Sequence, residues 1–176
     1  MSSDQTDAAV GGSWYACRTR SRAEKKVLAA LEGRSVESYL PLVARERQWA
    51  DRVKRVHFPL FPGYVFARFD LSGLGEVLRT PGLTEVVGVE GRPAPVSEQE
   101  LESVRALVEG IERTGLEPHA SDYLIVGEDV EVVEGPFKGL RGTLVDERGA
   151  SRVVVKLDAI RQALGVEMER RYLRPR

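Results

Sequence analysis

Few side chains of the kinds that perform bond chemistry occur in this 176-residue chain. It has one cysteine, Cys17, and two histidines, His57 and His119. A single cysteine can form neither an internal disulfide nor a thiolate metal cage within one chain. The sequence also lacks a phosphate loop ending in Lys-Ser or Lys-Thr, a Gly-x-Ser-x-Gly elbow and a His-Glu-x-x-His pair. We therefore predict no catalytic residue, no metal site and no cofactor, and we interpret Cys17 as a small core residue.

A run of aromatic residues and prolines, Pro59 to Phe66 (PLFPGYVF), is more informative. These residues enter a strand, and one of its two alternating faces must be buried. The two prolines fix the backbone at the entry to the strand. Alternatively, Trp14, Phe61 and Tyr64 could together form an exposed apolar patch of the kind that partners bind. Core packing and partner binding both remain possible explanations.

Charge is unevenly distributed along the chain. The net charge of the whole sequence is −1, but residues 13–70 carry +6 and residues 71–112 carry −5. Part of the positive charge lies in a polar stretch, Ala44 to Val56, which is too charged for a core and predicts a projecting hairpin. The average charge therefore hides a basic surface.

Two sequence patterns predict helix starts. Ser21 and Glu24 have the spacing of a capping box, so we expect a helix from about Arg22 to Glu32. Ser97 and Glu100 have the same spacing and precede a second amphipathic helix. The apolar face of this second helix is Leu101, Val104, Leu107, Val108 and Ile111.

The order of the elements predicts two domains of different class. Mixed helices and strands over residues 13–112 indicate an α+β domain in which helices pack on an antiparallel sheet. Short strands over residues 127–176 predict a small all-β barrel, because closure removes exposed sheet edges. We expect a loose tail over residues 1–12 and a linker over residues 113–126.

Both predicted domains resemble the NusG transcription factors. The resemblance rests on Trp14-Tyr15, the first helix, LFPGYVF and LRTPGLTEVVGVEGRPAPVS, followed by a KOW-like segment that includes GPFKGLRG. It covers about residues 13–176. It implies a NusG N-terminal domain joined to an SH3-like KOW barrel. The segment RQWADRVKRVHFPLFPGYVF looks more like the specialised UpxY and RfaH antiterminators than the housekeeping factor.

The resemblance implies a non-enzymatic role in transcription. The first domain of such proteins docks on the clamp helices of the largest subunit of RNA polymerase and suppresses pausing or termination. The positions matching the hydrophobic polymerase contact of the family are Trp14, Leu60, Phe61, Pro62 and Tyr64.

The resemblance also suggests a ligand for the basic surface. Family antiterminators touch the exposed non-template DNA strand at the start of the first helix, where this chain has Arg20, Arg22, Lys25 and Lys26. Basic residues elsewhere, including Arg52, Lys54 and Arg55 of the hairpin, could add to the same field. An ordinary solvated helix face and hairpin explain these residues equally well.

For the KOW domain, the resemblance implies contact with a small-subunit ribosomal protein or with the Rho terminator. Phe137 and Ile160 are the candidate partner residues, although Ile160 stands where relatives have an aromatic residue.

The leading hypothesis is a monomeric, cytoplasmic antitermination factor with no membrane segment. The alternative is an RNA- or ribosome-binding KOW module without a direct effect on elongation.

Overall fold

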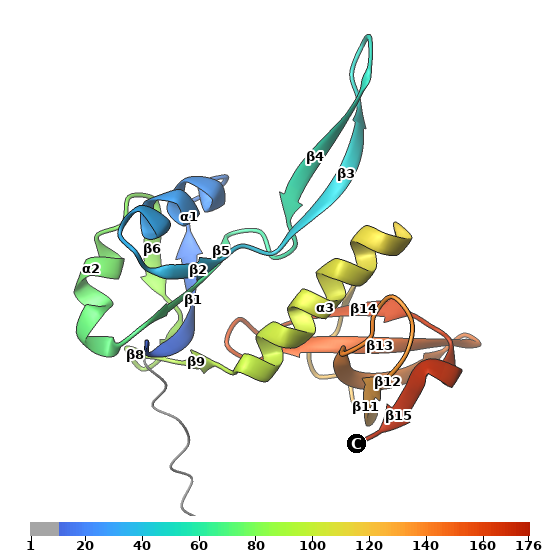
Figure 1. Ribbon diagram of the computed structural model, residues 1–176. Coiled ribbons are helices and arrows are strands. Elements are labelled where there is room, and N and C mark those ends of the chain that lie inside the picture. The colour runs from blue at the N-terminus through green and yellow to red at the C-terminus, as the bar shows by residue number, and fades with distance from the viewer. Residues whose placement is uncertain (1–10) are drawn as a thin grey trace, which may run out of the picture. The chain divides into compact units, whose positions relative to one another are not determined.

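The structure, a computed structural model, describes residues 11–176, which divide into two compact units (Figure 1). The first unit comprises the described residues up to Leu40 together with Phe61–Val96. The second comprises Pro41–Leu60 and Ser97–Arg176, so the hairpin and the third helix belong to the same unit as the C-terminal strands. The predicted α+β class is confirmed by antiparallel sheets with few helices.

An antiparallel sheet with strand order β2-β5-β1-β6 forms the centre of the first unit, and β9 also pairs with β1. Helix α1 packs against β2 and β5, and α2 packs against β6. The rings of Tyr15 and Phe69 lie 4.8 Å apart in the core, where their burial stabilises the sheet. The elements are β1 (Ser13–Thr19), α1 (Glu24–Gly33), β2 (Glu37–Tyr39), β5 (Tyr64–Phe69), the 3-10 helix η1 (Leu71–Gly73), α2 (Leu74–Leu78), β6 (Leu83–Val86), β7 (Gly88–Val89), β8 (Arg92–Pro93) and β9 (Pro95–Val96).

Helix α1 begins two residues later than the sequence pattern predicts. The interpretation of Ser21 and Glu24 as a capping box is wrong, because Ala23 is the N-cap residue and no side chain caps the helix. Arg22 has φ of 60°, a left-handed conformation that cannot belong to the first turn of a helix. The carboxylate of Glu24 is therefore available for another partner.

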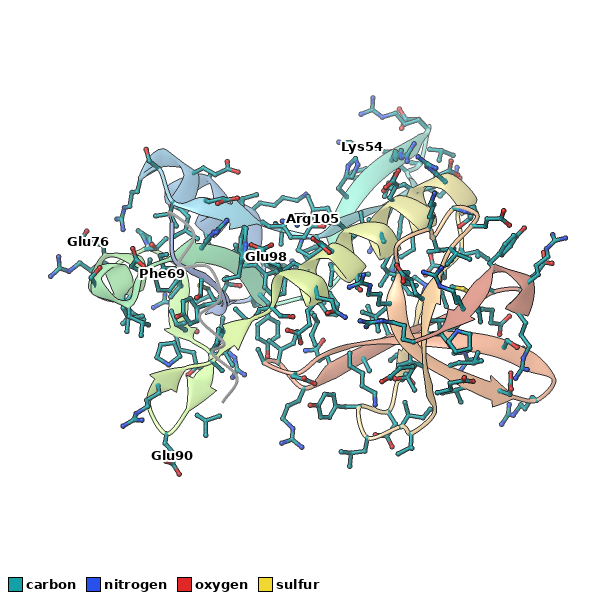
Figure 2. The ribbon with its side chains drawn as sticks, turned by 60° about the horizontal axis from the view of Figure 1, so that its bottom comes forward. Lys54, Phe69, Glu76, Glu90, Glu98 and Arg105 are labelled. Carbon is teal, nitrogen blue, oxygen red and sulfur yellow. The ribbon has the colours of Figure 1, made fainter. Side chains whose placement is uncertain are left out.

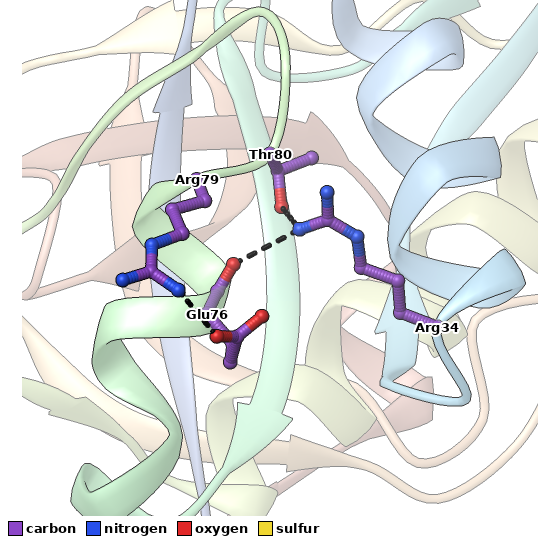
Figure 3. A network of polar contacts seen from close by, with 4 residues as sticks. All are labelled: Arg34, Glu76, Arg79 and Thr80. Atoms are coloured by element: carbon purple, nitrogen blue, oxygen red, sulfur yellow. Dashed lines mark hydrogen bonds and ion pairs between the residues drawn. The ribbon is translucent and has the colours of Figure 1, made fainter.

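A polar network joins the end of α1 to α2 (Figure 3). Arg34 Nη1 donates hydrogen bonds to the carbonyl oxygen of Glu76 at 3.0 Å and to Oγ1 of Thr80 at 3.4 Å. The Glu76 carboxylate in turn pairs with Arg79 at 2.7 Å. Because α2 has only five residues and cannot be stable alone, it depends on such tertiary contacts.

The second unit contains an antiparallel sheet with strand order β10-β14-β13-β12-β11-β15 and a separate β3-β4 hairpin. The predicted projecting hairpin and the predicted all-β C-terminal region are both found. Part of the predicted linker, His119–Ser121, is a strand that pairs with β14 instead. The elements are β3 (Leu42–Gln48), β4 (Val53–Pro59), α3 (Glu98–Thr114), β10 (His119–Ser121), β11 (Glu128–Val132), β12 (Arg141–Glu147), β13 (Ala150–Leu157), β14 (Gln162–Glu167), the 3-10 helix η2 (Arg170–Tyr172) and β15 (Leu173–Pro175).

Helix α3 begins with the predicted capping box. Ser97 Oγ accepts a hydrogen bond from the Glu100 backbone N–H at 3.1 Å, and the Glu100 carboxylate accepts one from the Ser97 N–H at 2.8 Å. Gly115, with φ of 70°, ends the helix in the left-handed conformation that glycine adopts readily. Four of the five predicted apolar-face residues are buried: Leu101, Val104, Leu107 and Ile111.

Most of the predicted loose tail, residues 1–12, lies outside the described residues. Its last residue, Gly12, accepts a hydrogen bond from Arg68 Nε at 3.1 Å. Among the helices of residues 11–176, none is long and apolar enough to span a membrane. The predicted domain limits, 13–112 and 127–176, remain a prediction.

Candidate functional site

A buried carboxylate holds the loop that leads into β5. Glu24 of α1 is 7% exposed, and its Oε1 accepts a hydrogen bond from the backbone N–H of Gly63 at 2.9 Å. The Gly63 carbonyl accepts a second bond, from the Thr19 N–H at 2.8 Å. Gly63 has φ of 87°, which favours glycine over any residue with a side chain. The start of β5 is therefore fixed by both α1 and β1.

The predicted exposed patch of Trp14, Phe61 and Tyr64 does not form. Trp14 and Phe61 are 3% and 2% exposed. The ring of Phe61 lies edge-on to Phe66 in the core, with 6.5 Å between centroids. Leu60 is also buried, so only Pro62, which is exposed, and Tyr64, which is half-buried, reach the surface from the predicted polymerase set.

Tyr64 belongs to a polar cluster on the surface of the first sheet. Its hydroxyl accepts a hydrogen bond from Arg18 Nη2 at 3.2 Å, and the Arg18 guanidinium lies 5.6 Å from the centre of the Tyr64 ring. Arg18 Nε also pairs with Glu85 at 3.3 Å. The three side chains come from β5, β1 and β6, so the sheet sets the orientation of the Tyr64 ring.

The four predicted nucleic-acid residues lie together on the turn between β1 and α1 and on the first turn of that helix. We call Arg20, Arg22, Lys25 and Lys26 the basic turn. All four are exposed. The Arg20 N–H donates to the Gly82 carbonyl at 2.8 Å, and the Ala23 N–H donates to the Arg20 carbonyl at 3.1 Å, which holds the backbone of the turn. Positive charge is thus concentrated on a short, fixed segment.

The predicted KOW contacts, Phe137 and Ile160, are both buried, with exposed fractions of 4% and 8%. Phe137 packs against Gly110 of α3, and a Cβ atom built on Gly110 would overlap the Phe137 ring. Neither side chain is accessible to a partner in this structure, and the Phe137 ring fills a site on the helix that only glycine leaves open. Beside Phe137 lies a cavity of about 310 Å³ whose lining includes Pro136, Met168 and Tyr172.

The one cysteine of the chain, Cys17, is buried in β1. Burial raises the pKa of Cys17 to about 12, so this side chain remains a neutral thiol at physiological pH. Within residues 11–176, no cluster of three or more histidine, cysteine, aspartate or glutamate side chains could hold a metal ion.

Two positioning residues were missed from the sequence. The spacing of Glu24 from Ser21 predicts a local capping bond, whereas its carboxylate accepts a hydrogen bond from Gly63. Glu112 of α3 holds the base of the hairpin: its carboxylate accepts hydrogen bonds from the Ala44 N–H at 2.9 Å and from Arg55 Nη2 at 2.7 Å. Both contacts join residues far apart in the sequence, so no local pattern marks them.

The chain has clear relatives among characterised proteins. A family model described as "Transcription termination factor nusG" matches residues 12–105, more than half of the chain. The transcription termination/antitermination protein NusG of Thermus thermophilus is 32% identical over 82% of this chain and 89% of its own length. NusG of Bacillus subtilis is 30% identical over 89% of this chain and 94% of its own.

A solved structure of Thermotoga maritima NusG aligns with 92% of this chain and 95% of its own, at 25% identity and a TM-score of 0.48. The residues matched by the family model, 12–105, include both the buried loop of Gly63 and the basic turn. On the strength of those matches, this chain belongs to the NusG family.

Proposed function

We propose that this chain is a transcription elongation and antitermination factor that binds RNA polymerase and suppresses pausing or termination. The observation that carries the proposal is the similarity, over most of the chain, to proteins named transcription termination/antitermination protein NusG. Such a role needs no bond chemistry, in keeping with the neutral, buried Cys17 thiol. Membership of the specialised UpxY and RfaH type remains a prediction.

The proposed polymerase contact is centred on Pro62 and Tyr64, and its target is the pair of clamp helices of the largest polymerase subunit. The hydrogen bond from Gly63 to Glu24 supports this choice, because it presents two surface residues from a fixed loop. Phe61, which is buried and directly precedes Pro62, would then support the contact from below. A factor that binds the closed clamp more tightly than the open clamp shifts the population toward the closed state.

The proposed nucleic-acid contact is the basic turn, and its ligand is the exposed non-template DNA strand. Support comes from four exposed cations within seven residues. Arg20, Arg22 and Lys26 form no ion pair with the carboxylates of the described residues, so their charge is available to phosphates.

A second partner, a small-subunit ribosomal protein or Rho, is proposed for the C-terminal sheet around Phe137 and Ile160. The largely apolar cavity beside Phe137 supports this part of the proposal. Because Phe137 is buried, direct contact with its ring requires that α3 release it first.

Binding of the whole chain to its cognate RNA polymerase tests the first contact. We expect Tyr64→Ala to weaken binding by about 30-fold, because loss of a central aromatic contact costs roughly 2 kcal/mol. Tyr64→Phe should retain most of the affinity if the ring, rather than the hydrogen bond from Arg18, makes the contact. Affinity is measured by biolayer interferometry on variants whose folding has been checked by circular dichroism.

Val89→Ala is the matched control, because Val89 is 69% exposed and lies in the same unit. It should leave the affinity unchanged. An equal loss from Val89→Ala, or no loss from Tyr64→Ala, would argue against the contact. A chain that ignores polymerase but binds structured RNA in a salt-dependent way would favour the RNA- or ribosome-binding alternative.

A further inference from the structure

The β3-β4 hairpin has two faces of different composition. Directly opposed residues of an antiparallel pair lie on the same face, and successive residues alternate between faces. The register places Val43 opposite Phe58, Arg45 opposite Val56 and Arg47 opposite Lys54 on one face. The other face has Ala44 opposite His57, Glu46 opposite Arg55 and Gln48 opposite Val53. The first face carries cations and no carboxylate, and we call it the cationic face.

The tip of the hairpin extends the cationic face with an aromatic ring. The Trp49 N–H donates to the Arg52 carbonyl at 2.8 Å and closes the turn. The ammonium group of Lys54, which is labelled in Figure 2, lies 5.7 Å from the centre of the Trp49 ring. Trp49 is 55% exposed, whereas the other tryptophan, Trp14, is 3% exposed. A large ring is therefore held at the surface beside a cation.

A second ring and cation are paired nearer the base. The Arg47 guanidinium lies 4.9 Å from the centre of the Phe58 ring. Phe58 lies opposite Val43, and Trp49 is six residues along the chain from Val43. At ~3.4 Å per residue, about 20 Å of the face separates the two aromatic residues. Such a strip is long enough to follow several nucleotides of an extended strand.

The outer charges of the cationic face remain available to a ligand. Arg45, near the base, pairs with Glu117 at 3.4 Å. Farther out, Arg47, Arg52 and Lys54 make no ion pair with any carboxylate of the described residues. The negative charge of Glu112 is directed instead to Arg55 on the opposite face.

We propose that the cationic face binds single-stranded nucleic acid, with a base stacked on Trp49 and phosphates bound by Arg47, Arg52 and Lys54. Exposed aromatic rings that alternate with cations are the two components of sequence-tolerant single-strand binding. Stacking on Trp49 requires an unpaired base, so a single strand fits this face better than a duplex does. DNA and RNA share this chemistry, and the experiment separates them. The proposed function uses none of these residues, so the two proposals can fail separately.

Tryptophan fluorescence of the whole chain provides a direct test. The probes are oligo-dT and oligo-U of about 12 nucleotides, within the usual range of single-strand site sizes. Stacking should quench the exposed Trp49 and leave the buried Trp14 unaffected. The titration is repeated in a variant whose basic turn is neutralised to alanine, which removes binding at that second surface. Quenching by only one of the two probes would support the proposal and identify its ligand as DNA or RNA.

Variants are compared by fluorescence anisotropy of the labelled oligonucleotides. We expect Trp49→Ala to weaken binding by about 5- to 150-fold. The pair Arg47→Ala and Lys54→Ala should reduce the slope of log K against log salt by about 1.4, or roughly 0.7 for each phosphate contact.

Val53→Ala is the matched control, because Val53 is also 55% exposed but lies on the opposite face of the hairpin. It should leave both affinity and salt slope unchanged. The proposal is overturned if Trp49 is not quenched, if Trp49→Ala binds as wild type does, or if Val53→Ala loses as much affinity as Trp49→Ala.

Discussion

Replacement of Gly110 by leucine is expected to lower the free energy of unfolding by about 2–3 kcal/mol. The reason is steric: even a Cβ atom at Gly110 would overlap Cδ1 of Phe137, and both residues are buried. Helix propensity acts in the opposite direction, because alanine in place of a helical glycine gains about 1 kcal/mol. Gly110→Ala should therefore be destabilising by less than Gly110→Leu. Urea unfolding followed by circular dichroism measures both variants.

Gly75→Ala is the control for helix propensity. Gly75 lies in α2, and a Cβ there would have nothing within 4 Å. This substitution should stabilise the chain or leave it unchanged. If Gly110→Ala stabilises the chain as much as Gly75→Ala does, then α3 and Phe137 are not packed as described.

Replacement of Glu24 by alanine is expected to cost about 2 kcal/mol of stability, as is usual for a hydrogen bond to a charged group. The substitution leaves the Gly63 N–H, which donates to the carboxylate at 2.9 Å, without its acceptor. Glu24→Gln retains a side-chain oxygen that can accept the same bond, so it should recover part of the loss. The measurement is again urea unfolding.

Because Gly63 precedes Tyr64, the alanine variant should also bind polymerase less tightly. Glu32→Ala changes an exposed glutamate on the same helix and should stay within about 0.5 kcal/mol of wild type. Equal stability of the Glu24→Ala and Glu32→Ala variants would show that the buried bond does not hold the loop.

The contrast between the two predicted capping boxes shows what a local pattern can determine. The box at Ser97 and Glu100 forms because all its hydrogen bonds lie within four residues. The same spacing fails at Ser21, where Glu24 bonds to a residue 39 positions away. A tertiary partner thus determined the role of the side chain, and no local pattern contains that information.

It is harder to predict from the sequence which residues of the candidate site are exposed. Aromatic residues such as Trp14 and Phe61 suit either a core or a binding patch, and only the packing of β1 and β5 shows that they are buried. Charged residues are less ambiguous, because isolated cations cannot be buried cheaply. The basic turn and the hairpin were therefore correctly expected at the surface.

Transcription by the cognate polymerase tests the central claim most directly. The measurement is read-through in vitro on a template with strong pause and terminator sites, with wild type, Tyr64→Ala, the neutralised basic turn and Val89→Ala. The account predicts that wild type and Val89→Ala increase read-through and that Tyr64→Ala, although folded, returns it to the level without factor. Unchanged read-through with wild type on every template, including the leader of its own operon, would contradict the account.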